Sequence, residues 1–307
     1  MIGIKKIATY IPSGRVDNLA RAASLGSTPE QVSERIGFRQ VARVESGEGA
    51  LDMAAKALTR LLQDADVDST EIEALVVVTQ NPDRNIPHLS AELHGKAGLP
   101  TSCACFDVGL GCSGYVYGLS VLASFMQANG LKRGVLVTAD PYSRIVDMDD
   151  KATALIFGDA ATATLLDDDP LYSLGRFTFG TQGSEADKLA CSDGVLFMNG
   201  RAVFNFAAVK VPANIRDTVA VNGLGLDGID RFVLHQGSRY IVETIADRLG
   251  VDRVKAPFMS ATYGNAVSSS IPLMLNELIQ EPAHARMLLC GFGLGLSWAS
   301  TVIQRKD

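Results

Sequence analysis

The chain has 307 residues, 47% of them hydrophobic and 20% charged, which is enough to bury the core of two ordinary domains or of one large duplicated one. Its formal charge is −6 and no basic stripe is present, so a nucleic-acid-binding protein is not expected. We also expect no membrane span and no signal peptide, because no apolar run approaches about 20 residues and the apolar N-terminal part is short; the expected location is the cytoplasm.

The first half of the chain alternates predicted strands and helices. Continuous apolar runs are typical of buried strands, whereas apolar residues three or four positions apart indicate helices. Ser27 or Thr28 is expected to cap the first helix, with Glu30 in capping range. The predicted strands are 2–10, 72–80, 104–108 and 133–140, with two more around Gly158-Asp159 within 152–169, and the predicted helices are 27–38, 50–67, 90–99 and 113–129.

The second half repeats this alternation after an irregular segment, residues 167–195, in which we expect long loops. Alternating strands and helices predict an α/β fold with mostly parallel sheets, and apolar helices indicate that some helices lie between sheets. The predicted helices are 203–220, 238–251 and 270–280, and the predicted strands are 228–236 and both sides of a glycine turn in 286–304.

Cys112 lies in a glycine-rich bend, within the sequence FDVGLGCSGYVYGL (106–119), between a predicted strand and a predicted helix. A helix N-terminus favours the thiolate and lowers the pKa of a cysteine, so this placement suits a nucleophile. Gly109 and Gly111 would permit the sharp bend, and Gly114 would leave room for a substrate. Alternatively, Cys112 is a small buried apolar side chain, which is the commoner role of a free cysteine.

The five cysteines, an odd number in a chain without a secretory signal, are expected to be free thiols. Cys103 and Cys105 form a C-x-C pair just before a predicted strand. A metal site would need two further Cys or His ligands at a matching spacing, and the four histidines do not provide them. We therefore expect no metal site.

Two polar residues of the second half are candidates for a binding site. His235 directly follows an apolar strand, and ligands of open α/β sheets collect beyond the carboxyl ends of strands. Asn265 follows Gly264 in YGNAVSSSIP, where a neutral amide could hold a carbonyl in a pocket. Each also has a structural explanation, because a lone histidine is often part of the core and an asparagine in a turn often bonds the local backbone.

The segment CGFGLGLSW (290–298) places three glycines in five residues between two predicted strands. Such a turn can direct a backbone N–H at a developing oxyanion. The segment does not match G-x-G-x-x-G, no helix follows it, and the chain has no G-x-x-x-x-G-K-[ST]. Nucleotide binding is therefore not expected.

These stretches, taken together, resemble one family, the β-ketoacyl-acyl-carrier-protein synthases of type III within the thiolase superfamily. Each segment alone is a weak match, but all occur in family order over nearly the whole chain. The matching segments are GIKKIATYIPSGRV, ERIGFRQ, FDVGLGCSGYVYGL, SRIVDMDDKATALIFGDAATATLL, FMNGRAVFNFAA, LHQGSRYI, YGNAVSSSIPL and GFGLGLSWAS.

The resemblance implies a thiolase-like α/β fold, in which two pseudo-symmetric βαβαβαβ halves form αβαβα layers. Residues 1–166 would form the half that carries the nucleophilic Cys112, and residues 167–307 the half that carries His235 and Asn265. The active site is expected where the two halves meet. Members of the family are homodimers, so a homodimer is expected here.

The resemblance also implies a decarboxylative condensation. Cys112 would accept an acyl group from an acyl-CoA or an acyl carrier protein. His235 and Asn265 would hold the thioester carbonyl of a malonyl substrate and stabilise the enolate that forms as carbon dioxide leaves. The backbone N–H groups of Cys112 and of Gly293 or Leu294 would bind the oxyanion. No cofactor is expected besides the thioester substrates.

The same resemblance assigns further residues to the substrate path. Ile86 would reach across the dimer to the acyl tunnel of the partner. Three departures from the family concern the entrance: Gln31 replaces a frequent tryptophan, Lys151 a common arginine, and Ser238 and Tyr240 an asparagine and a basic residue. The donor, coenzyme A or a carrier protein, and the chain length therefore stay open. The expected substrate-binding residues are Arg35, Lys151, Phe157, Met198, Gly200, Phe204, Gly237 and Ser238.

Other reactions of the superfamily would need other residues. A thiolase has a second cysteine at the position of Gly291, and the adjacent Cys290 is expected to be a buried strand residue. A 3-hydroxy-3-methylglutaryl synthase needs a glutamate base, for which Glu92 is a poor match. Two alternatives remain: transfer of the acyl group to a hydroxyl or amine, and an inactive partner subunit, although such subunits usually lose the Cys, His or Asn.

Overall fold

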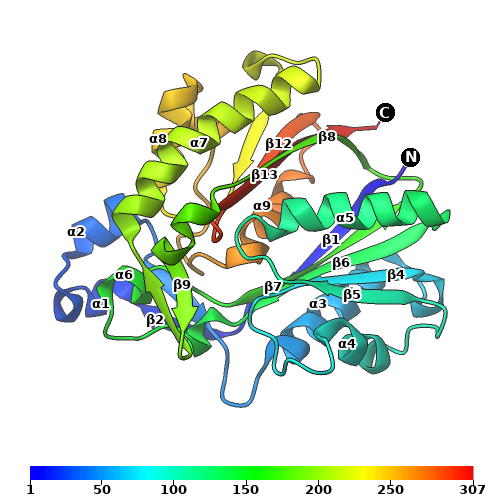
Figure 1. The fold of residues 1–307 in the computed structure, drawn as a ribbon, viewed down its shortest axis with the longest axis horizontal. Helices are drawn as coiled ribbons and strands as arrows, with labels where there is room; N and C mark the ends of the chain where they lie inside the picture. Colours follow the sequence, from blue (N-terminus) through cyan, green and yellow to red (C-terminus); the bar gives the residue numbers. More distant parts are fainter. Residues whose placement is uncertain (307) are drawn as a thin grey trace.

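The computed structural model describes residues 1–306 as an α/β fold in which strands and helices alternate (Figure 1). The strands are β1 (Gly3–Tyr10), β2 (Gly14–Asp17), β3 (Gln40–Arg43), β4 (Ala74–Val78), β5 (Ala104–Val108), β6 (Arg133–Asp140), β7 (Ala160–Asp167), β8 (Tyr172–Thr181), β9 (Leu189–Ser192), β10 (Val195–Met198), β11 (Arg231–Leu234), β12 (Arg286–Gly293) and β13 (Ser297–Arg305). The α-helices are α1 (Asn18–Arg21), α2 (Pro29–Gln31), α3 (Ala50–Ala65), α4 (Leu89–Ala97), α5 (Gly114–Asn129), α6 (Lys151–Ala154), α7 (Gly200–Val221), α8 (Arg239–Leu249) and α9 (Ser270–Leu278).

The main sheet has the strand order β11-β12-β13-β8-β1-β7-β6-β4-β5. The four strands from β11 to β8 repeat the order of β4, β6, β7 and β1, with the same parallel and antiparallel pairings, and the first half adds β5 at its edge. The two halves join where β1 pairs with β8. β7 ends at Asp167, so the boundary expected at 166/167 falls at the end of this strand.

Helices cover both outer faces of the sheet and fill the space between its two halves. α3 packs on β1, β6 and β7 of the first half, and α7 packs on β12 and β13 of the second. α5 and α9 contact strands of both halves and lie in the middle layer (Figure 1). This arrangement confirms the predicted αβαβα layers and the burial of apolar helices between sheets.

Successive side chains of a single strand belong to different layers of the core. In β11, Val233 faces the middle layer, whereas Phe232 and Leu234 pack towards α7 and α8. In β4, Val76 faces α5, and Leu75 packs towards α3. Because successive side chains of a strand point to opposite faces, a continuous apolar run is what a strand covered on both sides requires.

Three expectations about the fold are wrong. The sheet is mixed rather than mostly parallel, because β13 follows β12 through a tight glycine turn and must run antiparallel. Residues 152–169 contain one named strand, β7, since Asp150 caps the short helix α6 where the other strand was expected. Residues 167–195 are not mainly loop: they contain β8, which pairs with both β1 and β13, and β9, which pairs with β10.

The helical segment expected at residues 27–38 is shorter than predicted and is only partly α-helical. Thr28 caps α2, and the reciprocal partner is Gln31 rather than Glu30. A π-helical turn, η2 (Val32–Ile36), continues the segment. Within residues 1–306, none of the helices is long and apolar enough to cross a membrane.

Candidate active site

Cys112 lies two residues before the first residue of α5, in the bend that follows β5. Its side chain is buried, with 3% exposure. A Cβ at position 111 would lie 2.4 Å from Oε1 of Gln80 and 3.1 Å from Cδ1 of Leu294, so a side chain there would force Gln80 to move. Gly114 has another role than the one expected: a Cβ there would lie 2.5 Å from Cγ1 of Val78, so this glycine lets α5 approach β4 and does not open space for a substrate.

The electrostatic expectation for Cys112 is wrong for the ligand-free protein. Burial is the main reason that the pKa of the Cys112 thiol is raised to about 12, and the charge of Asp140 contributes to this shift. A backbone hydrogen bond from Leu294 acts in the opposite direction. Desolvation therefore outweighs the favourable position near a helix N-terminus, and the Cys112 thiol is neutral at pH 7 in the ligand-free protein.

The glycine turn between β12 and β13 lies directly against Cys112. Gly293 has a φ of +154°, and a Cβ there would lie 2.8 Å from Sγ of Cys112. At Gly291 a Cβ would lie 2.8 Å from the carbonyl oxygen of Cys112, so the second cysteine of a thiolase has no space here. The backbone N–H of Leu294 lowers the pKa of the Cys112 thiol, so it is the group of this turn that acts on the sulfur.

His235 directly follows β11 and continues its pairing, because its N–H donates to the carbonyl of Cys290 at 2.9 Å. The imidazole is 2% exposed and meets the ring of Phe292 edge-on at 5.4 Å. Burial lowers the pKa of His235 to about 3, and Nδ1 has no partner among the described residues. The ring is therefore neutral at pH 7 and can donate a hydrogen bond without carrying a charge.

Asn265 is held by its backbone and by its side-chain oxygen. Its N–H donates to Ile156 at 2.8 Å, and its carbonyl accepts from Gly158 at 3.0 Å. Oδ1 accepts from the N–H of Val267 at 2.9 Å and from the hydroxyl of Ser270 at 3.4 Å. These donors assign the oxygen, so the Nδ2 amide group is left to donate into the cavity.

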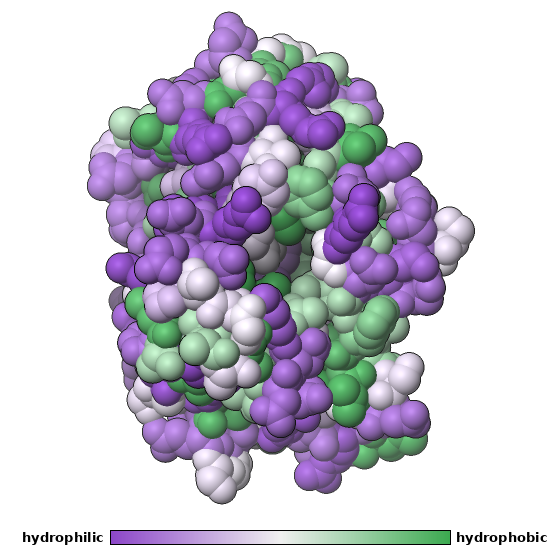
Figure 2. Space-filling model, turned by 90° about the vertical axis from the view of Figure 1, so that its left-hand side faces the viewer, coloured by the Kyte–Doolittle hydropathy of each residue, from purple (hydrophilic) through white to green (hydrophobic). Residues whose placement is uncertain are grey.

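These three side chains line one cavity of about 270 Å³. Cys112, His235 and Asn265 are almost fully buried, whereas Arg35 and Tyr240 are exposed, so the three form its floor and the other two lie near its mouth. Figure 2 views the side of the molecule where α1, α2 and β9 lie, and it shows a hollow bordered by hydrophobic residues near its centre. The remaining wall is mostly apolar and consists of Ile36, Ile156, Phe157, Leu189, Met198, Gly200, Val203, Phe204, Gly237, Ser238, Ile241, Phe292 and Gly293.

Most residues assigned to substrate binding from the sequence line this cavity, but Lys151 does not. Its ammonium group donates to the carbonyl of Gly26 at 2.6 Å, outside the cavity. Ile86 also lies outside it and is 87% exposed. Arg239 stacks on Phe258, with its guanidinium carbon 4.7 Å from the ring centroid, which is a structural role.

The wall residues that the sequence analysis missed follow two patterns. Val203 lies three positions after Gly200 in α7, and Ile241 lies three positions after Ser238, the N-cap of α8, so helical spacing could have identified them. Leu189 begins β9, in the segment expected to be loop, and no local signal indicated it.

The residues of alternative chemistries lie elsewhere. Cys290 is fully buried in β12, as expected, and Glu92 pairs with Arg84 at 3.4 Å on α4, outside the cavity. Among residues 1–306, no group of three or more His, Cys, Asp or Glu side chains is placed to hold a metal ion.

Comparisons with known proteins point to one family. Two sequence models match, 3-oxoacyl-[acyl-carrier-protein] synthase III over residues 106–183 and the C-terminal part of the same enzyme over residues 219–305. The β-ketoacyl-[acyl-carrier-protein] synthase III of Lactococcus lactis subsp. cremoris is 31% identical over 320 residues, covering 98% of each chain.

Solved structures agree with the sequence comparison. The β-ketoacyl-[acyl-carrier-protein] synthase III of Thermus thermophilus is 28% identical, with a TM-score of 0.91 over 99% of each chain. The priming β-ketosynthase of the R1128 polyketide pathway is 27% identical, with a TM-score of 0.91 over 100% of this chain and 97% of its own. The chain therefore belongs to the β-ketoacyl-[acyl-carrier-protein] synthase III family of thiolase-like condensing enzymes, which are acyltransferases.

Proposed function

We propose that Cys112, His235 and Asn265 carry out a decarboxylative condensation between an acyl thioester and a malonyl thioester. The observation that carries the assignment is the single cavity that the three side chains share at the junction of the two halves. A sulfur, a neutral imidazole and an oriented carboxamide are the groups that acyl transfer and enolate stabilisation require.

In the first step Cys112 attacks the carbonyl carbon of the acyl thioester. The sulfur gains the acyl group, the carbon–sulfur bond of the donor breaks, and the proton of Cys112 leaves with the released thiol. The oxyanion of the tetrahedral intermediate would accept hydrogen bonds from the backbone N–H groups of Cys112 and Leu294. Each such donor typically lowers a barrier by about 3 kcal/mol.

In the second step the malonyl thioester replaces the released carrier. The bond between its C2 and carboxylate breaks, carbon dioxide leaves, and the electron pair forms an enolate whose oxygen accepts from His235 and Asn265. A neutral imidazole suits this role, since burial keeps the pKa of His235 at about 3 and no imidazolium competes as an acid. C2 then attacks the acyl carbon, the bond between that carbon and Sγ of Cys112 breaks, and the sulfur leaves as a thiolate that takes up one proton from solvent to restore the thiol.

The cavity favours a modest acyl group delivered on a long, thin arm. Its 270 Å³ lies just below the range of about 300–1,000 Å³ that is usual for sites of drug-sized ligands. Arg35 is the cation that lines it, and Phe204 and Tyr240 stack at 5.2 Å beside it. We infer that a pantetheine thioester, on coenzyme A or on an acyl carrier protein, enters past these residues.

We also propose a homodimer that forms along the edge strand β5. β5 ends the main sheet and has no partner on one side within the described chain, and an open edge is a template for pairing. Phe106 of β5 packs on Phe125 of α5, and Tyr117 of the same helix packs on Phe179 of β8. Phe179 is 46% exposed, which favours a second copy of the chain as the cover of this face.

No separate cofactor is needed in this mechanism, because the thioester activates both reacting carbons. The five cysteines are all free thiols, which fits a reducing compartment such as the cytoplasm.

The test separates the two steps. The protein is acylated with a short acyl-CoA and then mixed with malonyl-acyl carrier protein, and both carbon dioxide and the β-ketoacyl product are measured. We expect His235→Ala and Asn265→Ala to keep acylation and to lower carbon dioxide release by about 10²–10³-fold. Acylation of the unaltered protein without carbon dioxide release would instead support acyl transfer to a hydroxyl or amine.

A further inference from the structure

Asp140 is a buried carboxyl group that the proposed steps do not use. It is the last residue of β6 and is fully buried. Oδ1 accepts from the backbone N–H of Gln80 at 2.8 Å and from the hydroxyl of Thr79 at 3.3 Å. Oδ2 accepts from the hydroxyl of Ser268. A buried carboxyl group that accepts hydrogen bonds from several donors is held in one fixed position.

The bond to Ser268 joins the two halves of the fold. Ser268 lies in the short 3-10 helix η8 (Val267–Ser269) of the second half, and Asp140 belongs to the first half. The next residue makes a similar connection, because Ser269 shares a 2.7 Å hydrogen bond with Thr138 of the same strand. Two consecutive serines therefore fasten η8 to the end of β6.

The residue before Ser268 has a strained backbone. Val267 has a φ of +50°, which a β-branched residue rarely adopts. Such a conformation persists only where the surroundings impose it. Here the conformation is useful, since it directs the N–H of Val267 to Oδ1 of Asn265 at 2.9 Å.

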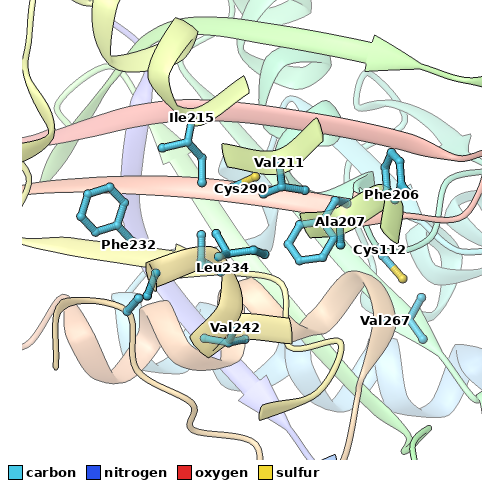
Figure 3. Close-up of a cluster of buried hydrophobic side chains, with 14 of the residues drawn as sticks. Cys112, Phe206, Ala207, Val211, Ile215, Phe232, Leu234, Val242, Val267 and Cys290 are labelled. Carbon is cyan, nitrogen blue, oxygen red and sulfur yellow. The ribbon is translucent and has the colours of Figure 1, made fainter. Parts of the chain in front are cut away.

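Val267 also belongs to the apolar cluster that contains Cys112. Both are almost fully buried, and Figure 3 shows them at the same end of this cluster. The side-chain oxygen of Asn265 is thus held by Val267, and the two residues after Val267 are anchored to β6 by the hydroxyls of Ser268 and Ser269.

We propose that Asp140 is a positioning residue for decarboxylation: through Ser268 it holds Val267 in its strained conformation and so keeps the amide N–H of Asn265 directed at the substrate carbonyl. This inference rests on the proposed function, in which Asn265 acts in the second step and not in the first. Burial raises the pKa of Asp140 to about 6, and its hydrogen bonds oppose this shift, so it is an acceptor above that pH.

The experiment measures the two half-reactions separately in Ser268→Ala. Single-turnover acylation of Cys112 by a short acyl-CoA is followed by intact mass. Carbon dioxide release is followed after malonyl-acyl carrier protein is added to the acylated protein. We expect the release rate to fall on the order of 10-fold, and the acylation rate to stay within about 3-fold of the unaltered protein.

A double-mutant cycle tests whether Ser268 acts through Asn265. If it does, Ser268→Ala in an Asn265→Ala background should change the release rate by less than about 2-fold, because the group that it orients is already gone. Asp140→Asn is the second variant, because it keeps the shape of the side chain. It should also lose carbon dioxide release, whereas acylation should not slow, since removing the charge of Asp140 lowers the pKa of the Cys112 thiol. Independent, additive losses in the cycle, or equal losses in both half-reactions, would overturn the proposal.

Ser300→Ala is the matched control. Ser300 is equally buried, and its hydroxyl donates to Oδ1 of Asn214 at 2.6 Å, away from the cavity. This variant should lose similar thermal stability with no difference between the half-reactions. Failure of the unaltered protein to acylate or to release carbon dioxide would refute the proposed function instead, so the two failures are distinguishable.

Discussion

Gly293 gives the sharpest structural prediction, because its Cα lies against the sulfur of Cys112. In Gly293→Ala the new methyl group would start 2.7 Å from Cβ and 2.8 Å from Sγ of Cys112. Non-bonded carbon and sulfur atoms need about 3.5–4.0 Å, so the sulfur or the turn must move by about 1 Å. Such a displacement of a reacting atom costs about 100-fold in rate, or about 2.7 kcal/mol in the barrier.

The assay is the single-turnover acylation rate of Cys112, followed by intact mass after mixing with an acyl-CoA. Because the φ of +154° is also unfavourable for alanine, a loss of stability of about 1–3 kcal/mol should accompany the loss of rate. Gly95→Ala is the control, since Gly95 lies within α4 with nothing within 4 Å of a new Cβ, and it should keep the full rate. An acylation rate of Gly293→Ala within about 3-fold of the unaltered protein would refute this account of the turn.

Three further predictions follow from the burial or exposure of single side chains. With its pKa near 12, Cys112 of the ligand-free protein should be alkylated by iodoacetamide at a rate that still rises about tenfold per pH unit between pH 8 and 10; a plateau at pH 8 in peptide mapping would contradict this. The pKa of His235 is about 3 in the folded protein and about 6.5 in the unfolded chain. Below pH 6.5 only the unfolded chain binds a proton at this ring, so the free energy of unfolding is highest above pH 6.5 and decreases as the pH falls. Between pH 7 and pH 4.5 the unaltered protein should lose about 3 kcal/mol more of its free energy of unfolding, measured with urea, than His235→Gln loses. An equal decrease in both proteins would be inconsistent with a buried neutral ring. Phe179→Glu should convert the proposed dimer to a monomer in light scattering, whereas Val254→Glu, at a site that is also exposed, should not; dimers in both would place the interface elsewhere.

Much of the fold was predictable because it rests on local patterns. The apolar run of β4 and the apolar surface of α5 follow directly from their burial between layers. The strand predicted around Phe157 is absent, since the apolar residues there form a single bridge to Asn265 and not a strand. Gly158 permits that bridge, because a Cβ there would lie 1.9 Å from the carbonyl of Tyr263, a contact between distant residues that no local pattern reveals.

The candidate site was also predictable only in part. Its chemistry-bearing residues stand out in the sequence, since Cys112 lies in a glycine bend and His235 ends an apolar strand. Whether Lys151 or Leu189 lines the cavity depends on how separate elements pack, and only the structure shows that the first does not and the second does. The raised pKa of Cys112 could not be predicted either, because it depends on the depth of burial and not on the helix that follows.

The most direct test of the account is the site of covalent attachment. The protein is incubated with a short acyl-CoA, its intact mass is measured, and the modified peptide is sequenced. We expect one added acyl group, located on Cys112. It should be absent in Cys112→Ala, and it should be lost from the protein when malonyl-acyl carrier protein is added. An adduct on another residue, or turnover that persists in Cys112→Ala, would contradict it.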